Sequence, residues 1–416
     1  MKKRTNVTRR SQPRNRFARR AFLCKAAGLA VAPSILKSAG ANDRLRLGLI
    51  GAGGRGSTLM GQVASLRNVV NAEVAAICDV WRVNLEQAAR KARKQFATQI
   101  KTTTRFGELL SWEDIDAVII ATPDFGHSPI LKAAAEAGKD AYVEKPMCYE
   151  IEEAREARDA VRRNNRVVQV GTQRRSDGYH MAACEIIRSG VLGKISRVSA
   201  AMNFNHARWL RDYRNCKEKD VDWDAYLFNR PKRPFDPRLL RRWHLFREFT
   251  NGISGLWMSH FVDAVSWIMD DPFPQSSVAS GGVYVWKEDR QTSDTFHALL
   301  AFPKEFLFSF AMGLGNSGGT HFAVRGTNGS LDLLKWVLSG EGGAGGKVIK
   351  KAVKITPKPS MHHMKNFLEC VFSRKRPVAD IEAGWRHSVA CVMTARALWT
   401  GKRQLFDPET EQIKEG

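Results

Sequence analysis

The chain has 416 residues, 43% of them hydrophobic, which is enough for two globular domains with buried cores. Its formal net charge of +24 would suit a nucleic-acid-binding protein, but residues 1–41 contain eleven Lys or Arg and no Asp or Glu. Without those eleven charges the total falls to about +13, and Asp220, Asp222 and Asp224 break up the positive charge of the Arg- and Trp-rich stretch 208–249. We therefore predict no nucleic-acid partner.

The N-terminal 41 residues resemble a twin-arginine export signal. A basic region ends in Arg19-Arg20-Ala21-Phe22-Leu23, and the apolar run at 26–36 is too short to span a bilayer. Small residues at 39–41 suit a cleavage site that leaves a mature start near Asn42. We expect a periplasmic or otherwise exported protein that uses the twin-arginine translocation machinery and is not an integral membrane protein. The alternative is a disordered basic tail.

A glycine-rich turn follows an apolar strand-like run at 45–50. Gly51, Gly53 and Gly56 have the G-x-G-x-x-G spacing, with Arg55 inside it. These glycines permit a tight turn, close approach of a pyrophosphate and close helix packing, and the helix N-terminus then faces the phosphates. The motif alone is weak, because an ordinary strand-to-helix corner has similar glycines.

A second apolar run, 72–80, has Asp79 as its next-to-last residue, 23 residues after Gly56. A ribose-binding carboxylate belongs near this position, and it favours NAD because it repels the 2′-phosphate of NADP. Arg82 follows closely, so NADP stays open. The predicted cofactor is NAD or NADP, with NAD favoured by Asp79.

Helix-like and strand-like runs alternate after Asp79, at 83–96, 115–121, 130–137, 141–143, 150–163 and 167–170. This alternation predicts an α/β fold whose first domain, 43–168, is a doubly wound parallel sheet of the Rossmann type. Ligands of such sheets bind at the carboxyl ends of the strands. Residues far apart in sequence should therefore share the rim of the glycine turn: Asp79, Thr122, His127, Lys145 and Gln173.

The second domain, 169–416, has longer strand-like runs, at 195–203, 278–285, 295–302, 306–314, 321–325 and 331–334. We expect an α+β domain with a mostly antiparallel open sheet and helices on one face, at 254–269, 364–372 and 382–400. The aromatic and basic segment 208–249 is either a solvated surface excursion or a loop over the substrate or a subunit contact. No Cys-x-x-Cys or zinc-like spacing occurs, so we predict no metal site.

Residues 43–416 resemble the glucose–fructose oxidoreductase and inositol dehydrogenase family, Gfo/Idh/MocA. The motifs that carry the resemblance are the glycine turn 51–56, Ala121-Thr-Pro-Asp124 with His127, Glu144-Lys-Pro146, the helix with His260 and Asp263, Val221-Asp-Trp-Asp224, and 376–384. The resemblance implies a nucleotide-binding first domain and a second domain that binds substrate and builds oligomers, here a dimer or tetramer.

The predicted site combines the turn motifs with this resemblance. The cofactor-binding residues are Gly51, Gly53, Arg55, Gly56, Asp79, Thr122, Pro123, His127, Glu144, Lys145 and Gln173, and the substrate-binding residues are Arg175 and Asp263. The resemblance implies that Lys145 and His260 are catalytic. Asp263, three residues after His260, could also orient its imidazole.

Hydride removal from a carbinol carbon requires a base for the hydroxyl proton. A lysine desolvated beside a cationic nicotinamide has a lowered pKa, and His260 is either that base or orients the hydroxyl. Many relatives carry an aspartate four residues before this histidine, whereas this chain has Leu256, which leaves the identity of the base open. Each residue also has a structural interpretation: Lys145 as a solvated lysine, His260 as a core histidine, His127 as a helix cap.

These features predict an exported NAD(P)-dependent oxidoreductase acting on CH–OH groups of a sugar, polyol or carbohydrate derivative. Outside the cytoplasm the nucleotide must be retained and recycled, so either a second substrate takes the hydride back or a transient ketone activates a neighbouring bond and a glycoside is cleaved. A non-catalytic nucleotide-binding protein is the remaining alternative.

Overall fold

The computed structural model describes residues 44–416, so the predicted export signal and its cleavage site lie outside the described residues. The first domain is a six-stranded sheet in which all neighbouring strands are parallel. Its order, 3-2-1-4-5-6, is that of the Rossmann fold and confirms the predicted doubly wound sheet. Across the sheet the strands are β3 (Lys101–Thr103), β2 (Ala72–Cys78), β1 (Leu45–Ile50), β4 (Ala117–Ile120), β5 (Asp140–Val143) and β6 (Val168–Val170).

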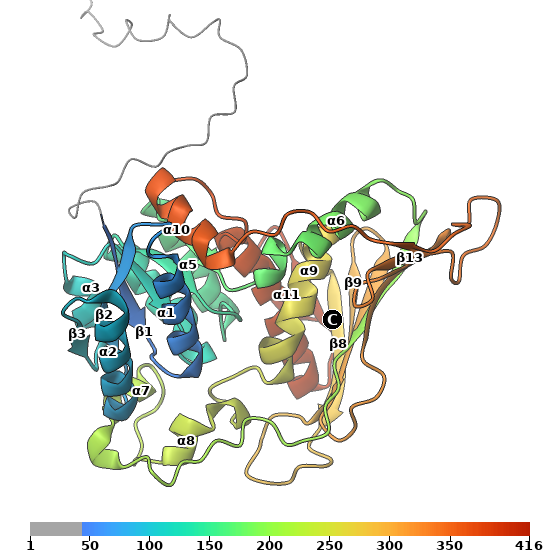
Figure 1. Ribbon diagram of the computed structural model, residues 1–416. Helices are drawn as coiled ribbons and strands as arrows, with labels where there is room; N and C mark the ends of the chain where they lie inside the picture. Colours follow the sequence, from blue (N-terminus) through green and yellow to red (C-terminus); the bar gives the residue numbers. More distant parts are fainter. Residues whose placement is uncertain (1–43) are drawn as a thin grey trace, which may run out of the picture. The chain divides into compact units, whose positions relative to one another are not determined.

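Helices cover both faces of this sheet (Figure 1). The connecting helices are α1 (Gly54–Leu66), α2 (Arg82–Phe96), α3 (Phe106–Ser111), α4 (His127–Glu136) and α5 (Ile151–Arg163). Two helices from the end of the chain, α10 (His363–Ser373) and α11 (Ile381–Thr400), complete the layers. Phe367 of α10 is buried in the same apolar cluster as α1 and α2, and Trp385 of α11 is buried with α4 and α5. The two C-terminal helices therefore pack into the apolar clusters on both faces of the parallel sheet.

The second domain is a ten-stranded sheet that is antiparallel except for one parallel pair, β7 with β10. This arrangement confirms the predicted mostly antiparallel sheet. Across it the strands are β14 (Val353–Lys354), β13 (Val337–Ser339), β12 (Gly329–Asp332), β11 (His321–Gly326), β7 (Ile195–Ala201), β10 (Phe306–Gly313), β9 (Thr295–Phe302), β8 (Ser276–Gly282), β15 (Gln404–Asp407) and β16 (Gln412–Glu415).

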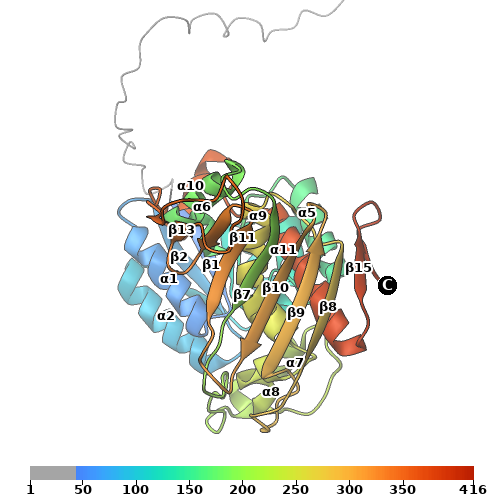
Figure 2. The same cartoon turned by 90° about the vertical axis from the view of Figure 1, so that its right-hand side faces the viewer.

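The two faces of this sheet differ. One face packs its phenylalanines against α6 (Gly178–Arg188), α9 (Ser259–Ile268) and α11, where Phe296, Phe308 and Phe310 are almost fully buried. The other face, turned toward the viewer in Figure 2, keeps Leu299 39% and Leu307 43% exposed. Among the described residues, no helix is long and apolar enough to cross a membrane.

The predicted helix over 254–269 begins as a π-helical turn, Ser254–Met258, and continues as α9. A π turn widens the helix by one residue, and such turns are frequent at functional sites. Here the turn immediately precedes His260, and the carbonyl of Leu256 within it accepts a hydrogen bond from the side chain of Lys145.

Residues 208–249, which we call the strap, pack on the first domain. The backbone N–H of Asp222 donates to the carbonyl of Val80 at 2.8 Å, and the hydroxyl of Thr104 donates to the Asp222 carboxylate at 2.8 Å. The strap carries α7 (Trp223–Leu227) and α8 (Pro237–Arg241), drawn in yellow-green below α1 and α2 in Figure 1. These contacts hold the strap at the carboxyl end of β2, where it is a structural wall rather than a solvated excursion.

Candidate active site

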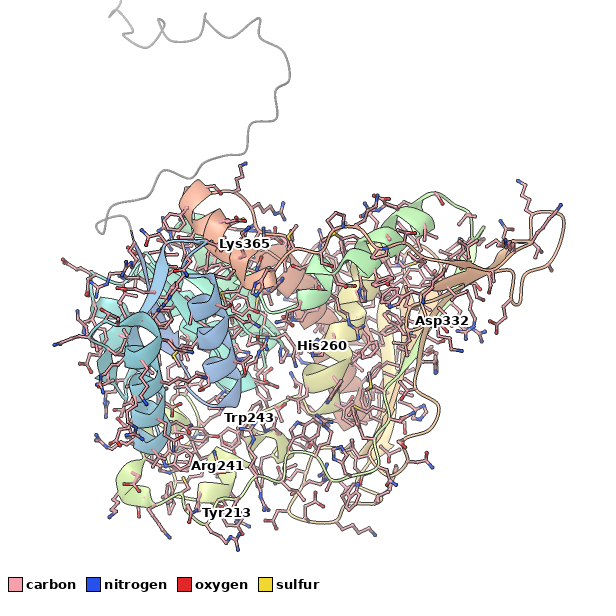
Figure 3. All side chains as sticks on the ribbon, viewed as in Figure 1. Tyr213, Arg241, Trp243, His260, Asp332 and Lys365 are labelled. Carbon is pink, nitrogen blue, oxygen red and sulfur yellow. The ribbon has the colours of Figure 1, made fainter. Side chains whose placement is uncertain are left out.

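A cavity of about 480 Å³ lies at the carboxyl ends of the parallel strands. Its walls come from the turns after β1, β2, β4, β5 and β6, from the strap and from the turn that leads into α9. In Figure 3 the labelled His260, Trp243 and Arg241 follow one another from α9 down into the strap. All five residues predicted to share this rim line the cavity: Asp79, Thr122, His127, Lys145 and Gln173.

The glycine turn has the geometry that a dinucleotide requires. Gly51 has φ +87°, and a Cβ on it would lie 2.7 Å from the backbone of Ala121. A Cβ on Gly56 would lie 1.9 Å from the carbonyl oxygen of Gly51, so only glycine lets α1 approach β1 this closely. In front of Gly53 the space is open, with Asn84 the nearest group at 3.9 Å. The turn thus fits a pyrophosphate on the first N–H groups of α1.

Asp79 is buried at the end of β2 and fixes the glycine turn. Its carboxylate accepts the backbone N–H of Ala52 at 2.7 Å and that of Trp81 at 2.9 Å. Burial raises the pKa of Asp79 to about 6, against the opposite effect of these two donors. A carboxylate has about four acceptor positions, so capacity for a ribose hydroxyl remains.

Three predicted cofactor residues belong to one hydrogen-bonded network across the rim. Arg55 donates to Glu144 through Nε at 2.7 Å and Nη2 at 2.6 Å. The phenol of Tyr142 lies 3.5 Å from the same carboxylate oxygen and accepts from Gln173 at 3.0 Å. The network fixes the glycine turn relative to the turns after β5 and β6.

Thr122, Pro123 and His127 shape the neighbouring wall. Both ring nitrogens of His127 face carbonyl oxygens, that of Pro146 at 2.7 Å and that of Thr122 at 2.9 Å. His127 therefore ties the turn after β4 to the Glu-Lys-Pro turn, and its nitrogens are used within the protein. The hydroxyl of Thr122 is buried without a hydrogen-bond partner among the described residues, so it is available to a ligand.

Lys145 projects from the end of β5 to the π turn, where its ammonium donates to the carbonyl of Leu256 at 2.8 Å. Burial lowers the pKa of Lys145, an effect that the charges of Asp124 and Glu144 oppose. A desolvated lysine of this kind is suited to accept a proton.

Asp124 supplies a carboxylate on the cavity wall although position 256 is leucine. It is 2% exposed and accepts the hydroxyl of Thr250 at 2.7 Å. Burial raises the pKa of Asp124 to about 7, while the Thr250 hydrogen bond and the charge of Lys145 lower it. Asp124 belongs to the Ala121-Thr-Pro-Asp124 motif, but its role is not predictable from the sequence, because its burial and the effect of the Lys145 charge on it depend on the fold.

His260 lies on the first turn of α9 and lines the cavity opposite the glycine turn. Burial lowers the pKa of His260 well below its ordinary value, and the charges of Lys145 and Arg174 lower it further. The imidazole is therefore neutral near pH 7 and able to accept a proton.

The structure places Arg175 and Asp263, the predicted substrate residues, away from the cavity. Nε of Arg175 lies 3.0 Å from both carboxylate oxygens of Asp263, and the two side chains are 6% and 1% exposed. Neither residue lines the cavity, because each satisfies the other's charge inside the second domain. Asp263 is thus engaged with Arg175 rather than with the imidazole of His260.

The strap contributes wall residues that the sequence analysis does not identify. Arg211, Arg241, Trp243 and His244 line the cavity, and the Arg241 guanidinium lies 4.6 Å from the ring centre of Trp81. The abundance of Arg and Trp in this segment is the sequence feature that could have indicated a ligand-binding wall. The sequence does not show which domain the segment packs against.

Residues 45–172 match the model described as "Oxidoreductase family, NAD-binding Rossmann fold", and residues 185–402 match "Oxidoreductase family, C-terminal alpha/beta domain". The chain belongs to the GFO/IDH/MocA oxidoreductase family. The two matched segments correspond to the parallel and the mostly antiparallel sheets of this GFO/IDH/MocA protein.

Individual relatives are more distant. A glycosyl hydrolase family 109 protein of Shewanella baltica is 30% identical over 188 residues, which are 44% of this chain and 40% of that protein. The chain thus spans about two fifths of the length of the curated relatives it matches. Two solved structures share the fold of this GFO/IDH/MocA chain. They are the WlbA dehydrogenase of Bordetella pertussis in complex with NADH and UDP-GlcNAcA (19% identity, TM-score 0.64, 86% of this chain and 98% of that one) and the aldose-aldose oxidoreductase of Caulobacter crescentus complexed with glycerol (16% identity, TM-score 0.66, 87% and 100%).

Proposed function

We propose that this protein is an exported NAD(P)-dependent oxidoreductase that acts on the CH–OH group of a sugar, polyol or related carbohydrate and retains its nucleotide through the catalytic cycle. One observation carries the proposal. The side chains of Lys145, Asp124 and His260 line the same cavity as the glycine turn. Proton-accepting groups and a dinucleotide cradle in one enclosure are what hydride removal from a carbinol needs.

Different residues of the cavity would bind the nucleotide and move the proton. The glycine turn, Arg55 and Thr122 would hold the nucleotide, and Asp79 supports NAD over NADP. When bound, the nicotinamide supplies the hydride acceptor. Neutral His260, or Lys145 with its lowered pKa, takes the hydroxyl proton, and the charge of Asp124 acts on Lys145.

Retention of the nucleotide is supported by the strap. It bonds to the first domain through Asp222 at the end of β2, and α8 places Arg241 over Trp81. Phe228 of the strap packs edge-on against Phe106 at 5.2 Å. We expect these contacts to slow the release of a nucleotide from the cavity.

Export itself rests on the arginine pair and the apolar run near the N-terminus. An exported enzyme meets no nucleotide pool, which explains why retention would be needed. The name of the Caulobacter crescentus structure, an aldose-aldose oxidoreductase, fits a cycle in which a second sugar takes the hydride back.

The test is to incubate the purified chain with a panel of sugars, polyols and glycosides and to follow the absorbance of reduced nicotinamide. We expect at least one compound to reduce the bound nucleotide and a second to reoxidise it. A nicotinamide that no member of the panel reduces would favour the non-catalytic alternative.

Redox-neutral glycoside cleavage is the second candidate, favoured by the glycosyl hydrolase family 109 name of the Shewanella relatives. In this version a transient ketone acidifies the adjacent C–H, the aglycone leaves with its bonding electrons, water adds, and the ketone is reduced again. A glycoside deuterated at the oxidised carbon would return its label, and the adjacent carbon would exchange with solvent. In the two-sugar cycle the label moves to the second sugar instead.

We also propose that the exposed face of the ten-stranded sheet joins subunits into a dimer or tetramer. Val278, Leu299 and Leu307 present apolar side chains from adjacent strands on that face. Sedimentation of wild type against a Leu299→Glu, Leu307→Glu variant tests this proposal, and an unchanged sedimentation coefficient in the variant would contradict it.

A further inference from the structure

The guanidinium of Arg208, at the start of the strap, has no acidic partner among the described residues. Arg55 on the cavity wall is paired with Glu144 at 2.6 Å, and Arg175 in the second domain is paired with Asp263 at 2.9 Å. Arg208 forms no ion pair and donates no side-chain hydrogen bond within residues 44–416, and its Nε is buried. The residue as a whole is half-buried, and its unpartnered donors are available to a ligand.

Aromatic rings hold this guanidinium in place beside the catalytic histidine. Its central carbon lies 4.3 Å from the ring centre of Phe204 and 5.0 Å from that of Trp257. The ring of Trp257 in turn meets that of His260 edge-on, with centroids 6.1 Å apart. Stacking fixes the plane of the guanidinium and leaves its N–H groups to donate sideways. Arg208 is therefore one aromatic ring away from His260.

The electrostatic environment on this side of the cavity is positive. Burial lowers the pKa of His244 well below its ordinary value, and Arg211, Lys145 and Arg208 lower it further. No carboxylate is among the groups that act on His244. Burial also lowers the pKa of Arg208, and no neighbouring carboxylate raises it. An anion entering beside His244 would meet several cations.

Flat aromatic surfaces lie beside these cations. Trp243 stacks on His244 with ring centroids 3.6 Å apart, and Trp209 stacks on the other side at 5.7 Å. Trp243 and His244 line the cavity together with His260. Aromatic walls with a few fixed polar groups are typical of small-ligand sites, and a sugar ring has an apolar face that can pack on them.

We propose that the carbohydrate bound beside His260 is acidic and that Arg208 binds its carboxylate or sulfate. This inference rests on the proposed function, because it names the substrate class of the same site. A planar guanidinium presents parallel N–H donors that match the oxygens of such a group. The sugar would then extend past Trp257, with its acidic group at Arg208 and its reacting end at His260 and Lys145.

The test uses the full chain with its retained nucleotide and matched pairs of sugars: methyl glucuronoside against methyl glucoside, and a sulfated against an unsulfated galactoside. Binding is measured by calorimetry and by tryptophan fluorescence, independently of turnover. We expect wild type to bind an acidic member about 10- to 100-fold more tightly than its neutral partner, the range for a hydrogen-bonded charge.

Variants separate the role of Arg208 from a general effect of charge. Arg208→Gln should abolish the preference, and Arg208→Lys should keep part of it because the charge stays while the paired donors are lost. Arg214→Gln is the matched control, since Arg214 lies in the same strap, is 82% exposed and pairs with Asp212 at 3.0 Å. The control should keep the full preference.

Three results would overturn the proposal: no acidic sugar binds better than its neutral partner, Arg208→Gln keeps the preference, or Arg208→Gln loses nucleotide while the preference stays. The last result would assign Arg208 to the cofactor. Failure of the proposed function looks different. In that case acidic sugars bind and depend on Arg208, but none of them reduces the nicotinamide.

Discussion

Gly56→Ala should abolish nucleotide retention. The added Cβ would lie 1.9 Å from the carbonyl oxygen of Gly51, whereas real Cβ contacts essentially never fall below 3.0 Å. Turn and helix must therefore separate by about 1.1 Å, from 1.9 to 3.0 Å. Neither atom belongs to a flexible side chain, so the backbone has to move. Overpacking of this kind costs about 1–3 kcal/mol or more of unfolding free energy.

The same displacement carries the first N–H groups of α1 away from the pyrophosphate position. Gly61→Ala is the matched control, because Gly61 is in the same helix, lies outside the cavity lining, and a Cβ there meets nothing within 4 Å. Each protein is denatured, and the released nucleotide is counted by mass spectrometry alongside a urea titration. We expect little nucleotide from Gly56→Ala and a wild-type amount from Gly61→Ala. Equal nucleotide and equal stability in both variants would refute the argument.

Three further substitutions test the remaining parts of the site. Lys145→Ala should retain nucleotide but slow the reduction of that nucleotide by a reactive sugar about 10²- to 10⁴-fold. Lys132→Ala, on the surface of α4, should keep the wild-type rate. Stopped-flow absorbance measures both rates, and full activity of Lys145→Ala would refute the assignment. The folded pKa of Asp124, about 7, exceeds the unfolded value of about 3.9, so its contribution to the unfolding free energy falls as the pH rises between them. Asp124→Asn should accordingly gain stability relative to wild type over that interval in urea titrations, and a pH-independent difference would contradict this. Asp222→Ala should release nucleotide several-fold faster on dialysis, and Asp224→Ala, 64% exposed, should match wild type; equal rates would show that the strap does not retain the nucleotide.

Local chemistry made much of the first domain predictable. Gly51 needs its positive φ, and the spacing to Asp79 follows from one β–α–β unit. The rule that ligands bind at the carboxyl ends of parallel strands placed Thr122, Lys145 and Gln173 on one rim. The short strands β3 and β13 to β16, two to four residues each, were not predicted because such segments are too short to show a periodicity.

The parts that could not be predicted depend on contacts between distant residues. Thr104 and Asp222 are 118 positions apart, and nothing in either segment indicates the hydrogen bond that closes the strap. Arg175 and Asp263, 88 positions apart, pair with each other, and neither lines the cavity. The role of Asp124 depends on burial, which raises its pKa and which the motif around it does not encode.

The central claim is that the protein carries its own nucleotide, and the most direct test is to identify that nucleotide. Mature protein from exported material is denatured, and the released compounds are identified by mass spectrometry with their molar ratio to protein. We predict NAD or NADP at close to one molecule per chain. Protein that is folded and exported but releases no nucleotide would contradict the account.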